Sequence, residues 1–348
     1  MRRLLAAVLM AVFATASAAF DPVTPGATLV FPRDLGAHPG YRIEWWYVTG
    51  QLAGPAGPLG FQVTFFRLRN PDGENRASRF APGQVLFAHA ALSDPNIGHL
   101  LHDQRSARAL PPLVEALGGD TRVRIDDWTL VREAGVYRTH VGGEDFALDL
   151  SFAPTQPLML QGDRGYSRKG TSGAQASYYY SEPQLKVTGR VTARGRAVDV
   201  TGTAWLDHEW SSEVLASEAA GWDWLGANLD DGRALMAFRI RKPDGSTLWS
   251  TATLRAPGGE PRTLAAVAFT PRRTWRSPRT GIAYPVAMTV EVDGRSWTLE
   301  PLMDDQELDA RSSSGVLYWE GAVSLRADDG ATGRGYLELT GYAERVPF

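Results

Sequence analysis

Apolar and polar residues alternate along most of this chain, with a period of two rather than 3.6. A period of two is typical of β-strands that bury one face. In the first half the pattern predicts strands at 41–52, 61–69, 84–92, 122–130, 137–141, 146–152, 176–180, 185–191 and 197–206. In the second half it predicts strands at 222–229, 233–241, 247–254, 286–292, 296–301, 315–325 and 335–342. Helical patterns are weak and limited to 114–117 and 212–220, so the chain is predicted to be all-β.

One unit of the sequence occurs twice. Trp-Trp-Tyr-Val at 45–48 and Phe-Arg-Leu-Arg-Asn-Pro-Asp-Gly at 66–73 return as Trp-Asp-Trp-Leu at 222–225 and Phe-Arg-Ile-Arg-Lys-Pro-Asp-Gly at 238–245. Each copy predicts a β-hairpin followed by a Pro-Asp-Gly turn that reverses the chain. The copies also end alike, because Val-Asp-Val-Thr-Gly at 198–202 matches Leu-Glu-Leu-Thr-Gly at 337–341. Two similar β domains in tandem are therefore predicted.

Many short antiparallel strands with tight connections are compatible with either a sandwich or a barrel, since open sheet edges invite aggregation. The 36 Gly and 22 Pro residues fall mostly between the predicted strands, where turns are needed. The repeated start and finish favour closed barrels, whose interiors hold side chains or one small ligand. We expect an N-terminal barrel domain at 19–210 and a C-terminal barrel domain at 211–348.

The first 18 residues have the pattern of a secretory signal peptide. Met-Arg-Arg is followed by an apolar run at 4–13 and by Ala-Ser-Ala at 16–18, a small-x-small cleavage signal. A membrane anchor would need about 20 apolar residues and different flanks. We therefore expect a mature chain that begins near Ala19 or Phe20, is periplasmic or secreted, and keeps no transmembrane segment.

The composition and the absence of several motifs exclude some classes of site and partner. The chain has 0 Cys residues, which excludes disulfides, thiolate metal sites and cysteine nucleophiles. Its formal net charge is −3 and its basic residues are scattered among acids, so no nucleic-acid partner is expected. The sequence contains no Gly-x-Ser-x-Gly elbow, phosphate loop, dinucleotide fingerprint or zinc-protease helix. Neither a cofactor nor a metal is expected.

Three aromatic and acidic clusters carry candidate chemistry, and they lie at 44–47, 205–210 and 221–224. The middle cluster lies between the two repeats, where ligand sites are often built. On a strand, Asp207 and Glu209 would share one face and His208 would lie on the other. Two carboxylates on one face suit acid–base chemistry, because repulsion and burial can hold one of them protonated at neutral pH. Asp207, His208 and Glu209 are therefore the candidate catalytic residues.

Eight further residues are candidates for contact with a substrate: Glu44, Trp45, Tyr47, His89, Tyr179, Trp210, Trp222 and Trp224. A structural role is the alternative, since Trp and Tyr fill barrel cores and an acid beside them accepts hydrogen bonds from indole or backbone N–H groups. His89 would be buried on an apolar strand, as a satisfied core histidine would be.

Several motifs together resemble those of a known family. They are Glu-Trp-Trp-Tyr at 44–47, Tyr-Tyr-Tyr-Ser at 178–181, Trp-Leu-Asp-His-Glu-Trp at 205–210, Gly-Trp-Asp-Trp at 221–224, Tyr-Pro at 284–285, Tyr-Trp-Glu-Gly at 318–321 and Gly-Tyr-Leu-Glu-Leu-Thr-Gly-Tyr at 335–342. The combination resembles the AttH-like secreted family, which is similar to the carotenoid 1,2-hydratases and whose members are often labelled secreted hydrolases. The resemblance spans nearly the whole mature chain. It implies two tandem lipocalin-like antiparallel β-barrels.

Carotenoid hydratases add water to an isolated terminal alkene, which requires an acid to protonate the alkene and a water to capture the resulting tertiary cation. The resemblance implies that Asp207 or Glu209 is the acid and that His208 orients the water. The His-x-Trp motif of His208 and Trp210 resembles the hydratase pattern most closely. Trp210 and Tyr47 would face the cation, each ring contributing about 0.5 to 2 kcal/mol.

Three functions stay open at this point. The first is a hydratase-like lyase that acts on an apolar prenoid or lipid-like molecule. The second is a non-catalytic periplasmic protein that binds such a molecule. The third is an envelope accessory or scaffold protein with barrels filled by side chains. The expected partner is an apolar small molecule, with a peripheral contact to the cell envelope.

Overall fold

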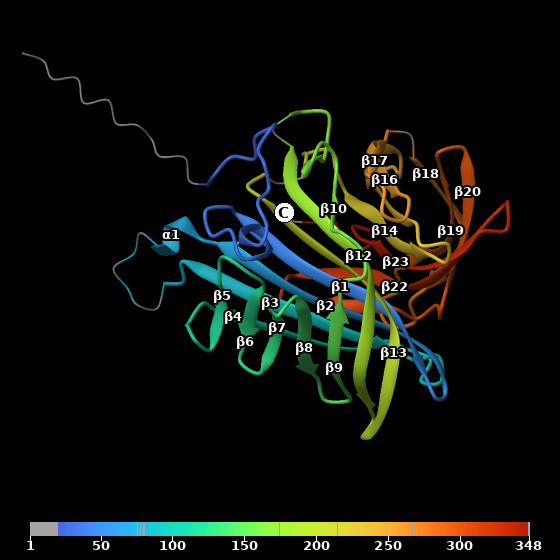
Figure 1. Ribbon diagram of the computed structural model, residues 1–348, viewed down its shortest axis with the longest axis horizontal. Coiled ribbons are helices and arrows are strands. Elements are labelled where there is room, and N and C mark those ends of the chain that lie inside the picture. The colour runs from blue at the N-terminus through green and yellow to red at the C-terminus, as the bar shows by residue number, and fades with distance from the viewer. Residues whose placement is uncertain are drawn as a thin grey trace, which may run out of the picture.

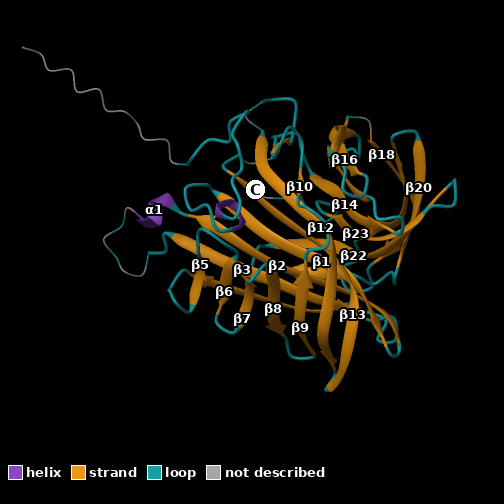
Figure 2. Ribbon diagram, in the orientation of Figure 1, coloured by secondary structure: helices purple, strands orange, loops and turns teal. Residues whose placement is uncertain are grey.

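The computed structural model describes residues 20–74, 76, 78, 81–173, 175–213, 215–265 and 267–346 of the 348-residue chain. The predicted signal peptide lies outside these residues. Helix in the described part consists of the 3-10 turn η1 (Arg33–Leu35) and the single turn α1 (Pro71–Glu74), and the rest of the regular structure is strand (Figure 2). No described helix has the length and apolar character needed to cross a membrane.

The first sheet has 13 strands. They are β1 (Ile43–Gly54), β2 (Gly57–Arg69), β3 (Gln84–Ser93), β4 (Leu101–Arg108), β5 (Val114–Ala116), β6 (Arg122–Ile125), β7 (Trp128–Glu133), β8 (Val136–Gly142), β9 (Phe146–Ala153), β10 (Met159–Leu160), β11 (Tyr166–Arg168), β12 (Ala176–Ala193) and β13 (Arg196–Ser211).

The second sheet has 10 strands. They are β14 (Gly221–Leu229), β15 (Ala234–Arg241), β16 (Thr247–Arg255), β17 (Arg262–Leu264), β18 (Val267–Arg276), β19 (Ala283–Val292), β20 (Arg295–Pro301), β21 (Glu307–Ala310), β22 (Val316–Ala327) and β23 (Thr332–Leu339).

The strand order of the second sheet repeats that of the first. The first sheet runs β4-β3-β2-β1-β13-β12-β9-β8-β7-β6-β5, and the second runs β17-β16-β15-β14-β23-β22-β20-β19-β18. In both sheets the first hairpin of the domain pairs with the last strand of the domain. Short additional strands pair with β12 in the first sheet and with β22 in the second. The duplication predicted from the sequence is therefore a duplication of topology.

Both sheets curl. In the first sheet β3 and β4 approach β6, and in the second β15 and β16 approach β18. One sheet forms a nearly closed barrel and the other a half-barrel, which confirms the prediction of two tandem antiparallel barrels. Each sheet surrounds its own hydrophobic core, because inward-facing residues alternate with outward-facing ones along each strand.

The strand ladders correct the predicted alignment of the repeat. Trp45 lies opposite Phe66 in the first hairpin, and Trp224 lies opposite Phe238 in the second. Because the repeat matches Phe66 with Phe238, Trp45 corresponds to Trp224 and not to Trp222. The matching ends of the copies were also misaligned: the segment at 198–202 lies early in β13, whereas the segment at 337–341 extends past the end of β23. Short motifs of alternating residues fit equally well after a shift of two positions.

Several element predictions were wrong. The predicted helix at 114–117 is β5, and the described part of 212–220 contains no helix. The strands β4 and β18 were missed because each lies near a sheet end, where polar side chains are exposed and the alternation is lost. The predicted strands at 176–180 and 185–191 form the single strand β12, interrupted by a bulge between Glu182 and Leu185.

The two barrels pack against each other through β1, β2 and β13 of the first sheet and β14, β22 and β23 of the second. Strand β1 contacts β23, β2 contacts β22, and β13 contacts β14 (Figure 1). A third hydrophobic cluster, separate from the two barrel cores, lies at this junction and contains Tyr47, Tyr179, Trp205, Trp224 and Phe238. The junction therefore has a core of its own, outside both barrels.

Candidate functional site

A cavity of about 200 Å³ lies at the junction of the two barrels. Most of its lining is apolar and aromatic, including Trp45, Phe66, Phe87, Trp222, Trp224, Phe238 and Ile240. Its charged or titratable lining residues include Asp207 and Glu209 from β13, Glu320 from β22, Glu338 from β23, Lys169, and His89 from β3. An apolar cavity with several carboxyl groups is the kind of site in which protonation states are strongly perturbed.

Three side chains donate hydrogen bonds to the Asp207 carboxylate. Tyr179 Oη lies 2.6 Å from Oδ2, and Ser181 Oγ and Trp205 Nε1 lie 2.5 and 2.6 Å from Oδ1. Burial raises the pKa of Asp207 to about 7, against the effect of the three donors, which favour the charged form. Asp207 is therefore poised to take up or release a proton near neutral pH.

Glu209 is held by a cation. Lys169 Nζ lies 2.8 Å from Glu209 Oε1, and Ser177 Oγ donates to the same oxygen at 2.5 Å. The Lys169 ammonium also lies 4.8 and 4.4 Å from the ring centroids of Tyr179 and Phe238. Lys169 thus balances the charge of one carboxylate in the cavity wall.

Glu320 and Glu338 lie directly opposite each other in the β22–β23 ladder. Burial raises the pKa of Glu320 well above its usual range, and the charge of Glu338 raises it further. Tyr47 Oη donates to Glu320 Oε2 at 2.7 Å, while Glu320 Oε1 has no hydrogen-bond partner. Burial also raises the pKa of Glu338 to about 7; a hydrogen bond from Trp222 opposes this shift, and the charge of Asp207 adds to it. Burial and the neighbouring charge of Glu338 therefore both favour the protonated form of Glu320.

The protonation states of these carboxyl groups differ because their surroundings differ. Asp207 accepts three hydrogen bonds, whereas one oxygen of Glu320 accepts none. Several uncompensated negative charges in one buried apolar site would cost too much free energy, so the group with fewest donors stays neutral. Carboxyl groups whose pKa values are pushed apart suit the roles of proton donor and proton acceptor.

Comparison with known proteins identifies the family of this chain. The AttH-like family model matches residues 22–342. The chain belongs to the AttH-like family. Among solved structures, it is similar to an AttH protein from Nitrosomonas europaea, with 56% sequence identity, a TM-score of 0.87, and coverage of 93% of this chain and 100% of that chain.

More distant structures share the fold of this AttH-like chain. Kievitone hydratase from Nectria haematococca is 15% identical, with a TM-score of 0.71 and coverage of 92% of this chain and 96% of that one. CghA with Sch210972 is 13% identical, with a TM-score of 0.54 and coverage of 86% and 89%. At these identities the likeness shows the fold alone. No curated protein sequence matches the chain.

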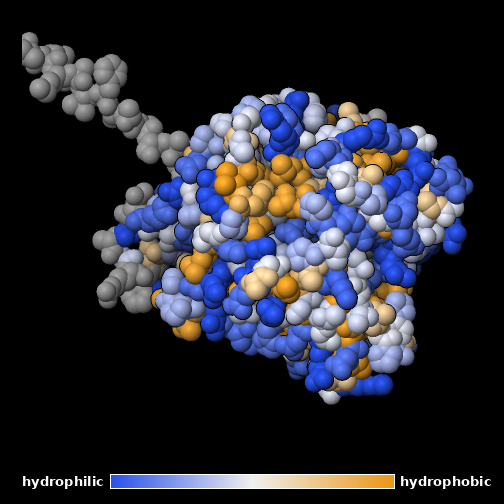
Figure 3. All heavy atoms as spheres, viewed as in Figure 1, coloured by the Kyte–Doolittle hydropathy of each residue, from blue (hydrophilic) through white to orange (hydrophobic). Residues whose placement is uncertain are grey.

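The structure brings together most of the residues predicted for the site. The predicted residues that line the cavity of this AttH-like chain are Trp45, Tyr47, His89, Asp207, Glu209, Trp222 and Trp224. Tyr179 lies behind them and hydrogen-bonds Asp207. On the face seen in Figure 3, a hydrophobic patch lies amid hydrophilic surface, near the C-terminal end marked in Figure 1. Val346, close to that end, is one of the cavity residues.

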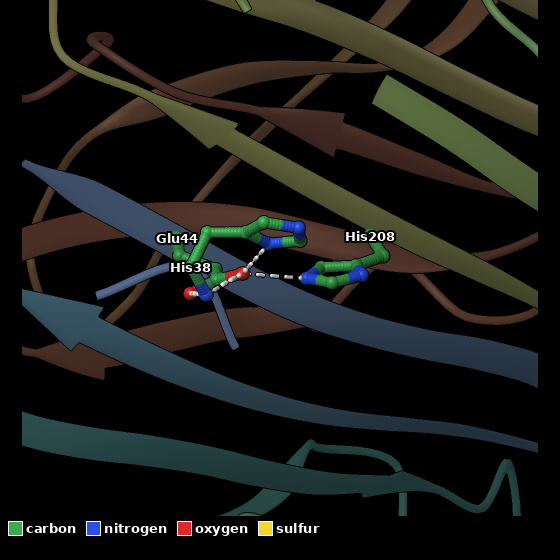
Figure 4. Close-up of side chains that lie close together, drawn as sticks. All are labelled: His38, Glu44 and His208. Carbon is green, nitrogen blue, oxygen red and sulfur yellow. Dashed lines mark hydrogen bonds and ion pairs between the residues drawn. The ribbon is translucent and has the colours of Figure 1, made fainter. Parts of the chain in front are cut away.

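The other three predicted residues, Glu44, His208 and Trp210, belong to the first barrel's interior network and not to the cavity. His208 Nε2 and His38 Nδ1 lie 2.8 and 2.7 Å from Glu44 Oε1 (Figure 4). Arg67 Nε donates to Glu44 Oε2 at 2.9 Å, and the Trp210 ring stacks on the His38 ring at 3.8 Å. Because side chains alternate along β13, His208 and Trp210 face away from Asp207. The alternation of side chains along β13 therefore separates His208 and Trp210 from Asp207 and Glu209.

The group of His38, Glu44 and His208 has ligand atoms within 4.8 Å of one another, which is a spacing that a metal ion could use. Burial lowers the pKa of His208 to about 4, so its ring is neutral. Burial would raise the pKa of Glu44, but hydrogen bonds from the two histidines outweigh it and lower that pKa. The resulting carboxylate is already paired with Arg67. Arg67 already neutralises the carboxylate at Oε2, and both histidine nitrogens already hydrogen-bond Oε1, so the donor set fits a structural ion network better than a metal centre.

Glu320 and Glu338 are the site residues that sequence reasoning missed. Both lie in motifs that carried the family resemblance, Tyr-Trp-Glu-Gly and Tyr-Leu-Glu-Leu. Glu338 also occupies the polar position of an alternating strand, which predicts exposure to solvent. The available signal was the acid between two aromatic or apolar residues, the same signal that selected Asp207 and Glu209. These two motifs lie far in sequence from the segment between the repeats, so local pattern alone does not place their acids in the site.

Proposed function

We propose that this AttH-like protein is a hydratase-like lyase that adds water to a carbon–carbon double bond of an apolar prenoid or lipid-like molecule. The observation that carries the proposal is that Glu320, with one oxygen lacking a hydrogen-bond partner, and Asp207, with three donors, line the wall of one apolar cavity. The fold shared with kievitone hydratase supports it. We also propose that the protein is exported, because residues 1–18 have the pattern of a signal peptide.

Glu320 is the proton donor in this scheme. Its carboxyl group transfers a proton to one alkene carbon, the π electron pair forms the new C–H bond, and the other carbon becomes a cation. Glu320 is left as a carboxylate, which the Tyr47 hydroxyl stabilises through its hydrogen bond to Oε2. General-acid catalysis of this kind contributes about 100- to 10,000-fold to a rate.

Aromatic rings stabilise the cation. Trp45, Tyr47 and Trp224 line the cavity. A well-placed ring contributes about 0.5 to 2 kcal/mol, most when the cation is desolvated. A tertiary carbon, as found at the branch points of prenoids, would add its own stabilisation. The site therefore favours branched alkenes over linear ones.

Asp207 is the proton acceptor. A water molecule attacks the cation through its oxygen and transfers one proton to the Asp207 carboxylate, so a hydroxyl group remains on the carbon. Tyr179, Ser181 and Trp205 fix the carboxylate in place through their hydrogen bonds. One proton leaves Glu320 and one arrives at Asp207, so the reaction adds one water overall.

The cavity volume limits how much of a substrate is enclosed. Pockets for drug-sized ligands are commonly about 300 to 1,000 Å³, and this cavity is about 200 Å³. A short terpene chain, or the reacting end of a longer prenoid, would fit inside. The remainder of a long molecule would extend through the opening.

The test is incubation of the purified protein with acyclic terpenes and acyclic carotenoids in isotopically labelled water. Mass spectrometry should detect an alcohol that carries the labelled oxygen. Glu320→Gln and Asp207→Asn should each lower the rate about 100-fold or more, while uptake of the uncharged fluorophore N-phenyl-1-naphthylamine stays unchanged. Binding of the terpenes with no labelled product would overturn the enzymatic proposal and favour a lipid-binding protein.

A further inference from the structure

The proposed reaction leaves Glu320 without its proton, and a chain of hydrogen-bonded side chains ends beside it. We propose that Ser313, His89 and Tyr318 form a proton relay that returns a proton from the outer surface to Glu320. The inference rests on the proposed function, because only the reaction consumes the delivered proton. The relay itself belongs to the protein without substrate.

The inner end of the relay is on β22. Tyr318 and Glu320 are two residues apart on one strand and therefore share a face, and both side chains line the same cavity. Glu320 Oε1 has no hydrogen-bond partner. Tyr318 Oη lies 2.7 Å from His89 Nδ1. The unpartnered oxygen is where a delivered proton would arrive.

The middle of the relay is a neutral imidazole. His89 lies on β3 of the first barrel with 1% of its surface exposed, and its Nε2 lies 2.8 Å from Ser313 Oγ. Burial lowers the pKa of His89 to about 3. A neutral imidazole has one nitrogen that donates and one that accepts, so it can take a proton on one side and release one on the other.

The outer end opens on a second hollow of the surface. Ser313 Oγ donates to Gln104 Oε1 at 2.7 Å, and the Ser313 backbone N–H donates to the same oxygen at 3.0 Å. Ser313 and Gln104 are both partly exposed. Gln104 lines an open, charged hollow together with His102, Arg279, Glu307, Asp309 and Arg311. Water therefore reaches the outer end of the relay, whereas the inner end faces the apolar cavity.

The transfers balance. Before delivery, the Ser313 hydroxyl rotates away from Gln104 Oε1 and donates to His89 Nε2, His89 Nδ1–H donates to Tyr318 Oη, and the Tyr318 hydroxyl turns toward the Glu320 carboxylate. Tyr318 then passes its proton to Glu320, His89 passes its Nδ1 proton to Tyr318, and Ser313 passes its proton to His89 Nε2. Ser313 takes a proton from a solvent water, which leaves as hydroxide into the bulk, and donates again to Gln104. One proton enters at Ser313 and one arrives at Glu320.

Both barrels supply the relay. His89 and Gln104 come from β3 and β4 of the first sheet, and Ser313 and Tyr318 from the β21–β22 turn and β22 of the second. The path exists only where the two barrels dock. A structural hydrogen-bond network would also bridge the barrels, so the test has to measure proton movement and not stability alone.

The experiment follows hydrogen–deuterium exchange at the Glu320 carboxyl group by infrared spectroscopy after rapid dilution into deuterium oxide. The carbonyl band is assigned by its loss in Glu320→Gln. N-phenyl-1-naphthylamine fills the cavity during the measurement, so that solvent cannot reach Glu320 from that side. The variants are Tyr318→Phe and His89→Gln, and the matched control is His102→Gln, which alters a histidine of the outer hollow outside the relay.

We expect exchange in Tyr318→Phe and in His89→Gln to be slower than in the wild type by about ten-fold or more. The His102→Gln control should exchange at the wild-type rate. Added imidazole should restore fast exchange to His89→Ala, which a purely structural role would not allow. Equal rates in the wild type and both relay variants would overturn the relay, as would absence of a protonated Glu320 band at neutral pH. Slowed exchange without any hydrated terpene would retain the relay and reject the proposed reaction.

Discussion

Glu209 of β13 and Glu338 of β23 occupy the same position in the strand ladders of the two barrels. Glu209 lies opposite Trp45 in the β1–β13 ladder, and Glu338 lies opposite Trp224 in the β14–β23 ladder. Both glutamates line the cavity. The cavity walls are therefore the same face of a duplicated unit, and the carboxyl groups gather there because the two copies face each other.

Asp207→Asn should make the stability less dependent on pH. The folded protein raises the pKa of Asp207 from 3.8 to about 7, so the folded state binds a proton there that the unfolded state releases. The stabilisation that this bound proton gives is fully present below the ordinary pKa and is lost as the pH rises through about 7. Over that range the free energy of unfolding falls by up to about 1.4 kcal/mol per pH unit. Urea denaturation of both proteins across this range measures the difference. Parallel profiles would show that Asp207 is not perturbed.

Lys169→Met should destabilise the fold by about 3 kcal/mol, because it leaves the buried Glu209 carboxylate without its cation. The double variant Lys169→Met with Glu209→Gln should recover most of the loss, since no charge stays unpaired. Lys186→Met, at an exposed position of β12, should change stability by less than about 0.5 kcal/mol. A double variant as unstable as the single one would show that Lys169 acts through packing instead.

Glu44→Gln should destabilise the first barrel by about 3 to 5 kcal/mol, because Arg67 is fully buried and would lose its carboxylate. Asp199→Asn is the control, since Asp199 pairs with Arg190 at the surface and such pairs contribute about 1 kcal/mol or less. Added Zn²⁺ should leave the melting temperature of the wild type unchanged. A clear rise with Zn²⁺ would instead identify Glu44 and its histidine partners as metal ligands.

Ile240→Trp should close the cavity. Ile240 is a buried lining residue, and the larger indole would occupy space that a ligand needs. Binding of N-phenyl-1-naphthylamine, measured by fluorescence titration, should weaken about ten-fold or more, while overpacking costs about 1 to 3 kcal/mol of stability. Ile240→Leu keeps the volume and should bind the probe as the wild type does. Unaltered binding to Ile240→Trp would place the probe elsewhere on the protein.

Local pattern determined much of the fold from the sequence alone. The period-two alternation identified most of the long strands, and the repeated hairpin motif identified the duplication that the strand order confirms. The alternation also placed Asp207 and Glu209 on one face of β13 and His208 on the other. These features depend only on residues that are neighbours in the chain, which is why a single sequence contains them.

Only the tertiary structure decided which face of each strand meets the other barrel. An alternating motif fits a ladder equally well after a shift of two residues. Only the residues paired across each hairpin show that the counterpart of Trp45 is Trp224 and not Trp222. Glu320 and Glu338 join Asp207 because β22 and β23 dock against β1 and β2, more than 100 residues away in sequence. Their protonation states depend on burial and on opposing charges at that junction, and neither exists until the two barrels pack together.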